Sequence, residues 1–155
     1  MNFKRTVIKS FSVIGKEGAT KAGEDFINSL WVEVNQKFSE VEKLAKLEDG
    51  FIAGYWGLMS DFSRQYLPWE DNYSKGLYLA GVEVENDKQA PNNWVKWTIP
   101  TFEYIYVDVE KDYAETLIKG LDYLKNNGYN LVGAVQEFHC PVEKRLYLFY
   151  PINRL

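Results

Sequence analysis

The sequence has one cysteine and one histidine, Cys140 and His139, and they are neighbours in the chain. One cysteine cannot form an intramolecular disulfide, so the cysteine content gives no sign of an oxidising compartment. A metal site needs several convergent ligands, whereas adjacent residues of a strand point to opposite faces of a sheet. We therefore expect no metal site and no cofactor, and a cytoplasmic location is the simplest interpretation.

Basic charge and long apolar runs are also scarce. The formal net charge is -4, the isoelectric point is near 5.1, and no run rich in lysine or arginine is present. Because a phosphate backbone is bound through clustered basic residues, we expect no direct contact with nucleic acid. No apolar run is long enough to span a bilayer, and the first residues lack the features of a signal peptide, so no membrane partner is expected.

Aromatic residues, by contrast, are abundant. They make up 16% of the chain, with 5 tryptophans, 11 tyrosines and 9 phenylalanines. Aromatic side chains fill protein cores, and they also line ligand cavities. Several of them fall in runs that cannot all point inward, over residues 51–56, 66–73 and 94–106. Core packing and a ligand cavity are both consistent with this distribution.

The hydrophobic pattern predicts one domain, 1–155, with two helices and seven strands. Apolar residues at three- and four-residue steps from Phe26 to Ala45 predict a long helix with Thr20 as N-cap and an end at residues 48–50. Asp112, with Glu115 three residues later, predicts a second helix that stops at residues 126–128. The glycines at 15 and 18 are expected in a turn. Strands are expected over 11–14, 51–60, 76–85, 94–99, 102–109, 131–139 and 145–152.

This order is a strand, a helix and two strands, repeated once. It predicts an α+β fold of duplicated β-α-β-β units with pseudo-twofold symmetry, unit one over about 1–90 and unit two over about 91–155. We expect the helices on one side of the sheet and a ligand groove on the other, along the seam between the units. Under the duplication Trp56 corresponds to Val135 and is expected across the groove from Glu137. The aromatic loop 61–75 is a candidate lid.

Glu137 is the one charged residue in an apolar segment, 133–138, that has the pattern of a buried strand. It is either a solvated or ion-paired strand residue or a carboxylate in a pocket. A carboxylate removed from water is unfavourable unless it is compensated, and a bound cation compensates it. This favours a pocket role. His139, at the end of the strand, is expected at the surface.

Several segments together resemble the GyrI-like small-molecule-binding family, the stand-alone relatives of effector-binding domains in AraC-type and MerR-type regulators. They are 13–18, 27–31, 54–61, 78–84, 97–100, 102–104 and 149–152, and they extend over nearly the whole chain. The resemblance implies two β-α-β-β units around a groove, and an aromatic pocket whose central acidic residue corresponds to Glu137. Many relatives carry a second acidic residue on the last strand. Here residues 145–151 are mostly aromatic and aliphatic instead.

Two functions follow as hypotheses from the resemblance. The first is a module that binds lipophilic, often cationic, planar compounds, with Glu137 as the charge complement and a possible regulator partner of unknown identity. The second is a hydrolase of cyclopropane-bearing or similarly electrophilic toxic natural products, with Glu137 as general base or acid and Tyr147 polarising the ligand. A pure interaction protein without a pocket is a third alternative. The expected pocket walls are Trp56, Trp69, Tyr78, Trp97, Tyr104, Tyr147 and Phe149.

Overall fold

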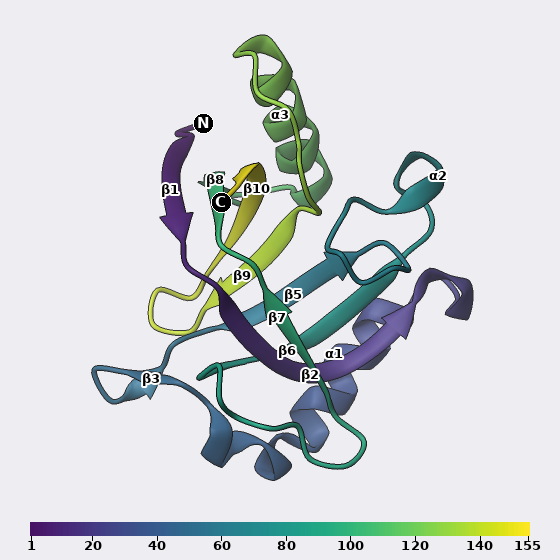
Figure 1. The fold of residues 1–155 in the computed structure, drawn as a ribbon, viewed down its shortest axis with the longest axis vertical. Helices are drawn as coiled ribbons and strands as arrows, with labels where there is room; N and C mark the ends of the chain where they lie inside the picture. The colour runs from purple at the N-terminus through teal and green to yellow at the C-terminus, as the bar shows by residue number, and fades with distance from the viewer.

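The computed structural model describes residues 1–155 and is built on one eight-stranded antiparallel sheet that curls into a half-barrel (Figure 1). The strand order across the sheet is β1-β8-β10-β9-β5-β6-β2-β7. A small separate hairpin is formed by β3 and β4. The strands are β1 (Lys4–Ile8), β2 (Phe11–Ala19), β3 (Leu47–Glu48), β4 (Phe51–Ile52), β5 (Tyr55–Ser60), β6 (Leu77–Val84), β7 (Val95–Ile99), β8 (Phe102–Asp108), β9 (Gln136–Cys140) and β10 (Arg145–Arg154), and the helices are α1 (Phe26–Gln36), α2 (Glu70–Tyr73) and α3 (Tyr113–Asn126).

The sheet has the predicted pseudo-twofold symmetry. The units β2-α1-β5-β6 and β8-α3-β9-β10 give the same strand order from either edge, and β5 and β9 meet at the centre. The α+β duplication is therefore confirmed. One strand per unit adds to it: β1 pairs with β8 and β7 pairs with β2, so each unit supplies an edge strand to the other. The sequence analysis missed β1, because its charged residues Lys4 and Arg5, typical of a protected edge strand, mask the pattern.

The glycines expected in a turn lie inside a strand. β2 continues through Gly15 and Gly18 to Ala19, and Gly15 pairs with Gly81 of β6. A Cβ atom on Gly15 would overlap the backbone of Ala80. Gly15 and Gly81 thus allow a close approach of β2 and β6, which is the other common role of glycine in a strand, and Gly18 leaves room for Leu30 and Phe26 of α1.

The first helix is shorter than predicted, whereas the second helix is confirmed. α1 begins at Phe26 and ends at Gln36, and two short 3₁₀ turns follow, Phe38–Glu40 and Glu42–Leu44. The apolar stripe still identified the packing face, because Val34 and Val41 are both fully buried. In α3 the Asp112 side chain accepts a hydrogen bond of 3.0 Å from the Glu115 backbone N–H, as a helix N-cap does.

The two faces of the sheet carry different cores. The inner, concave face holds an aromatic core that includes Trp56, Trp97 and Phe149. The outer face is covered by α1 over the first unit and by α3 over the second, each with its own apolar cluster. The helices lie apart, on either side of the central β5–β9 pair (Figure 1). None of the helices is long and apolar enough to cross a membrane.

Candidate ligand-binding site

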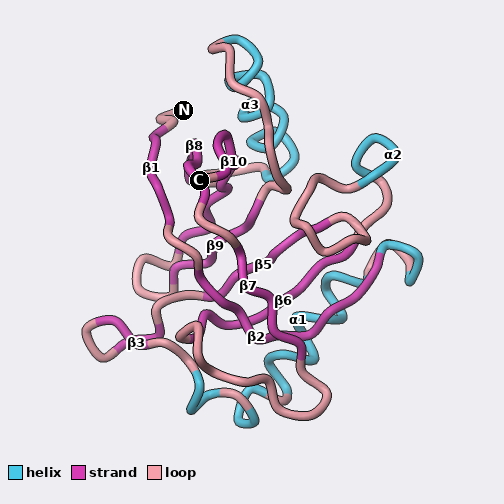
Figure 2. Tube along the Cα trace, in the orientation of Figure 1, coloured by secondary structure: helices cyan, strands magenta, loops and turns pink.

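The sheet opens on one side of its central seam. β5 and β9 pair only at Tyr55–Gly57 with Glu137–His139, and the strand expected over 131–139 begins as late as Gln136. The Gln136 side chain replaces the missing backbone pairing, since its amide accepts from the Met59 N–H at 2.7 Å and donates to the Met59 carbonyl at 3.2 Å. Residues 131–135 therefore leave the sheet as a loop between α3 and β9 (Figure 2).

A cavity of about 660 Å³ fills the space that this opening leaves between α1 and α3. This cavity lies on the same side of the sheet as the helices, whereas the sequence analysis expected a ligand groove on the opposite face. Eleven of its fourteen lining residues are hydrophobic, and Glu137 is the only charged one. The lining residues are Ile27, Met59, Pro68, Trp69, Asn72, Tyr73, Tyr113, Leu117, Ile118, Leu121, Leu131, Ala134, Val135 and Glu137.

Glu137 is buried at the inner end of this cavity, with 8% of its surface exposed. The Tyr78 hydroxyl donates a hydrogen bond of 2.5 Å to Oε1, and the Tyr113 hydroxyl donates to Oε2. The Trp31 indole N–H donates in turn to the Tyr78 hydroxyl at 3.1 Å. Burial raises the pKa of Glu137, and the hydrogen bonds from the two phenols partly oppose that rise.

Two other glutamates with mostly buried side chains lie on the inner face, and both have cationic partners. Glu83 accepts from the Trp56 indole N–H at 2.8 Å and lies 3.5 Å from the Lys46 ammonium. Glu17 accepts from the Trp97 indole N–H at 2.8 Å and from Arg64 at 2.5 Å. Glu137 takes part in no ion pair. Its carboxylate thus has hydroxyl donors and no compensating charge.

Two of the predicted wall residues are at this site. Trp69 lines the cavity and donates its indole N–H to the Leu77 carbonyl at 2.9 Å, while Tyr78 contacts Glu137 directly. The structure does not bring the others together with Glu137. They lie on the inner face, within or against its aromatic core: Trp56, Trp97, Tyr104, Tyr147 and Phe149.

The register of the central strands explains this difference. Trp56 pairs with Phe138, and Gly57 pairs with Glu137, so the neighbour of Glu137 on its own face is a glycine. Trp56 is therefore not across a groove from Glu137, as expected, but on the opposite side of the sheet. A Cβ atom on Gly57 would overlap the Tyr78 hydroxyl and Glu137 Oε1. The glycine makes room for the contact between them.

The second phenol that donates to Glu137 belongs to Tyr113, which the sequence analysis did not single out. Tyr147, the predicted catalytic partner, lies on the other face and donates to Glu143 at 3.0 Å. Tyr113 is the first residue of α3, directly after the N-cap Asp112. Its position at a helix start beside the central seam was the signal available in the sequence.

The candidate lid, 61–75, contributes side chains to both faces of the sheet. Tyr66 packs on Trp97 with ring centres 5.8 Å apart and so belongs to the inner face. Residues 68–73 contribute Pro68, Trp69, Asn72 and Tyr73 to the wall of the cavity. The loop therefore contributes to both cores and to the wall of the pocket.

His139 is less exposed than expected. Its Nε2 atom is buried without a hydrogen-bond partner, and its ring lies edge-on to Trp31 with centres 5.2 Å apart. Burial lowers its pKa. His139 thus packs against Trp31 of α1 on the outer face.

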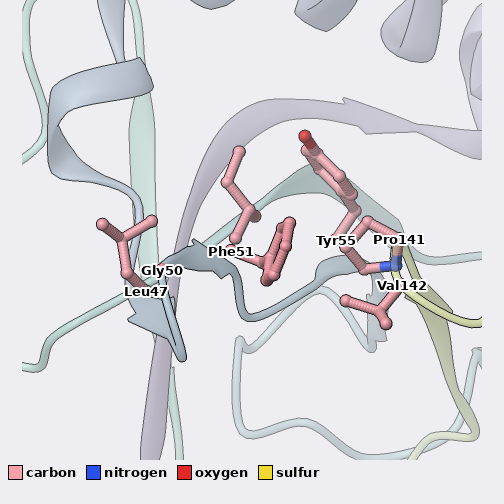
Figure 3. A pocket seen from close by; sticks show the side chains of 7 residues that line it. Leu47, Gly50, Phe51, Tyr55, Pro141 and Val142 are labelled. Carbon is pink, nitrogen blue, oxygen red and sulfur yellow. The ribbon is translucent and has the colours of Figure 1, made fainter.

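A second concavity of about 500 Å³ lies between the β3–β4 hairpin and the β9–β10 turn (Figure 3). None of its lining residues is charged, and Phe51 and Val142 are more than half exposed. It lacks the buried carboxylate of the first cavity. The residues that line it are Leu47, Gly50, Phe51, Ile52, Tyr55, Pro141 and Val142.

No protein-family model and no curated protein matches the sequence, whereas solved structures match the fold. SAV2435 bound to tetraphenylphosphonium superposes with a TM-score of 0.67 at 15% identity, over 99% of this chain and 94% of that one. The EcmrR C-terminal domain gives 0.67 at 16% identity, over 99% and 98%. A hydrolase from Listeria innocua gives 0.54 at 10% identity, over 97% and 91%. The chain thus has the GyrI-like fold that its sequence resemblance predicted.

Proposed function

We propose that this protein binds lipophilic, cationic, planar small molecules in the cavity between α1 and α3. The observation that carries the proposal is the buried carboxylate of Glu137, which has no basic partner inside an otherwise uncharged, mainly apolar cavity. An organic cation supplies the missing charge, and its apolar body replaces water along the walls. The bound tetraphenylphosphonium in SAV2435, which shares the fold, supports a lipophilic cation as the ligand.

The cavity has the size and lining of a small-molecule site. Its volume of about 660 Å³ is within the range of drug-sized pockets, roughly 300 to 1,000 Å³. Trp69, Tyr73 and Tyr113 line it, and an aromatic face adds about 0.5 to 2 kcal/mol of attraction for a cation close to it. Metal cations such as Mg²⁺ and Ca²⁺ require several oxygen ligands, whereas the cavity offers one carboxylate. An organic cation fits this donor set better.

The test compares two ions of matched size and opposite charge, tetraphenylphosphonium and tetraphenylborate. Both present four phenyl groups, so apolar burial is nearly the same for each. We expect saturable binding of the phosphonium by calorimetry and at least tenfold weaker binding of the borate, because the borate brings a second negative charge to Glu137. Equal affinities would show that charge at Glu137 does not select the ligand.

Hydrolysis of an electrophilic ligand is a second candidate function, and it is favoured by the two phenols on Glu137. A carboxylate whose pKa burial raises is suited to accept a proton from water, and the Tyr113 hydroxyl is placed to donate to a ligand oxygen in the same cavity. Turnover of a cyclopropane-bearing substrate that is lost in Glu137→Gln, with binding retained, supports it. An unchanged rate in that variant excludes Glu137 as the base.

A further inference from the structure

The cavity beside Glu137 has a neighbouring cavity along α3. This third cavity, of about 360 Å³, lies at the far end of that helix. Tyr73, Leu121 and Leu131 line both cavities, and they come from the end of α2, from α3 and from the loop after α3. The two spaces therefore lie side by side along α3 and share these three apolar side chains.

The far cavity differs from the near one in its polar groups. Lys125 and Asn130 line it; the Lys125 ammonium makes no ion pair, and the Asn130 amide makes no side-chain hydrogen bond within the protein. Lys119, on the same helix but outside both cavities, is instead paired with Glu115 at 2.7 Å. The near cavity thus holds a buried carboxylate, and the far one is lined by two exposed polar side chains, one of them positively charged.

The distance between the two ends limits the ligand. Tyr113, which contacts Glu137, and Lys125 are twelve positions apart in α3, which corresponds to about 18 Å at 1.5 Å per residue. A compact planar cation of three fused rings is too short to reach both ends. Tyr73, which lines both cavities, is 52% exposed, so the surface between them is accessible from solvent.

We propose that the site takes elongated amphipathic molecules with a cationic group at one end and an anionic group at the other. The cation lies at Glu137, an apolar chain crosses the wall of Tyr73, Leu121 and Leu131, and the anionic group reaches Lys125 and Asn130. This inference rests on the proposed function, because it assigns the near end to a cation. It adds Lys125 as a residue that determines specificity.

Two probes with the same head group and chain length test the assignment. Undecyltrimethylammonium ends in a methyl group, and 11-(trimethylammonio)undecanoate ends in a carboxylate. Calorimetry below the micelle-forming concentration is expected to show that the wild-type protein binds the carboxylated probe at least as tightly as the plain one. In Lys125→Glu the carboxylated probe is expected to bind about tenfold more weakly, and the plain probe is expected to keep its affinity. Lys125→Gln, which avoids a negative charge at the end of α3, is expected to weaken the carboxylated probe about three- to fivefold.

Lys119→Glu is the matched control, because it makes the same charge change on α3 outside both cavities. It is expected to leave both affinities unchanged. Equal effects of Lys125→Glu and Lys119→Glu, or equal effects of Lys125→Glu on the two probes, would overturn the role of Lys125 while leaving the cation site intact. Failure of the plain probe to bind, or its indifference to Glu137→Gln, would overturn the proposed function itself and this inference with it.

Discussion

Replacement of Glu137 by glutamine tests the charge of the site with almost no change of shape. Glu137 is 8% exposed, so its interaction with a bound cation is screened as at a buried protein site, with an effective dielectric constant of about 20. For a cationic centre about 5 Å away this gives about 3 kcal/mol, or about 10²-fold in Kd. We expect Glu137→Gln to weaken tetraphenylphosphonium by about that factor.

The matched control is Glu83→Gln, which makes the same change of net charge on the opposite face of the sheet. Glu83 keeps a hydrogen-bond acceptor for the Trp56 indole in that variant, and its distance from the cavity leaves the ligand untouched. Trp69 lines the cavity, so its fluorescence provides a titration signal, with calorimetry as the second method. The reasoning is refuted if Glu137→Gln binds the cation as tightly as the wild type, or if both variants lose affinity equally.

The same variant has an effect on the unliganded protein. Burial raises the pKa of Glu137, so its carboxylate contributes stability below the pKa of the unfolded chain and loses it as the pH rises through the folded pKa. Glutamine carries no charge, and its amide can still accept from one phenol and donate to the other oxygen. We therefore expect the melting temperature of unliganded Glu137→Gln at pH 8 to equal or exceed that of the wild type. Stability and cation affinity then change in opposite directions, which a misfolded variant cannot produce.

Three further predictions follow from the same geometry. Affinity for a permanent cation is expected to rise with pH through the raised pKa of Glu137 and then level off, because the protonated carboxyl must lose its proton before the cation binds. Calorimetry in buffers of different ionisation enthalpy measures this proton release. A pH-independent Kd without proton release contradicts the prediction. Burial lowers the pKa of His139, so the free energy of unfolding is expected to decrease as the pH falls below about 6.5, the pKa of an exposed histidine. Denaturant titrations at several pH values measure this decrease. The same dependence of the unfolding free energy on pH in His139→Gln rules the prediction out. Gly57→Ala places a Cβ atom against the Tyr78 hydroxyl and Glu137. It is expected to lower the stability measured by thermal unfolding by about 1 to 3 kcal/mol and to lower cation affinity. A fully stable variant with unchanged binding would show that the close approach is not required.

The parts of the fold that local patterns determine were predictable from the sequence. Asp112 and Gly128 bracket α3 by capping, and alternation of apolar residues located most of the strands. The pairing of Gly15 with Gly81 was not predictable, because it joins residues far apart in the chain. A glycine in that sequence context predicts a turn equally well. The curvature of the sheet therefore depends on how strands pair, and the sequence of a single strand does not show it.

The site shows the same division. Glu137 was identifiable because a charge inside an apolar strand requires compensation. Its neighbours were not, because a shift of one residue in register moves a side chain to the opposite face, and the seam aligns Glu137 with Gly57 rather than with Trp56. Register likewise places Trp56, Tyr147 and Phe149 opposite Phe138 and Gln136, on the inner face. Tyr113 reaches Glu137 because α3 begins beside the seam, and the position of that helix start in space is not encoded in a local pattern.

The mostly buried glutamates on the two faces of the sheet differ in their partners, and this difference argues for a ligand on the outer face. On the inner face Glu17 and Glu83 each hold a tryptophan indole and are each paired with a basic side chain, so no charge is left for a ligand. On the outer face Glu137 is held by neutral hydroxyls alone. A hydroxyl can rotate away, or accept from a new donor, without leaving a charge behind. Glu137 can therefore be satisfied in the empty cavity and still gain from a cation, which is what a reversible binding site requires.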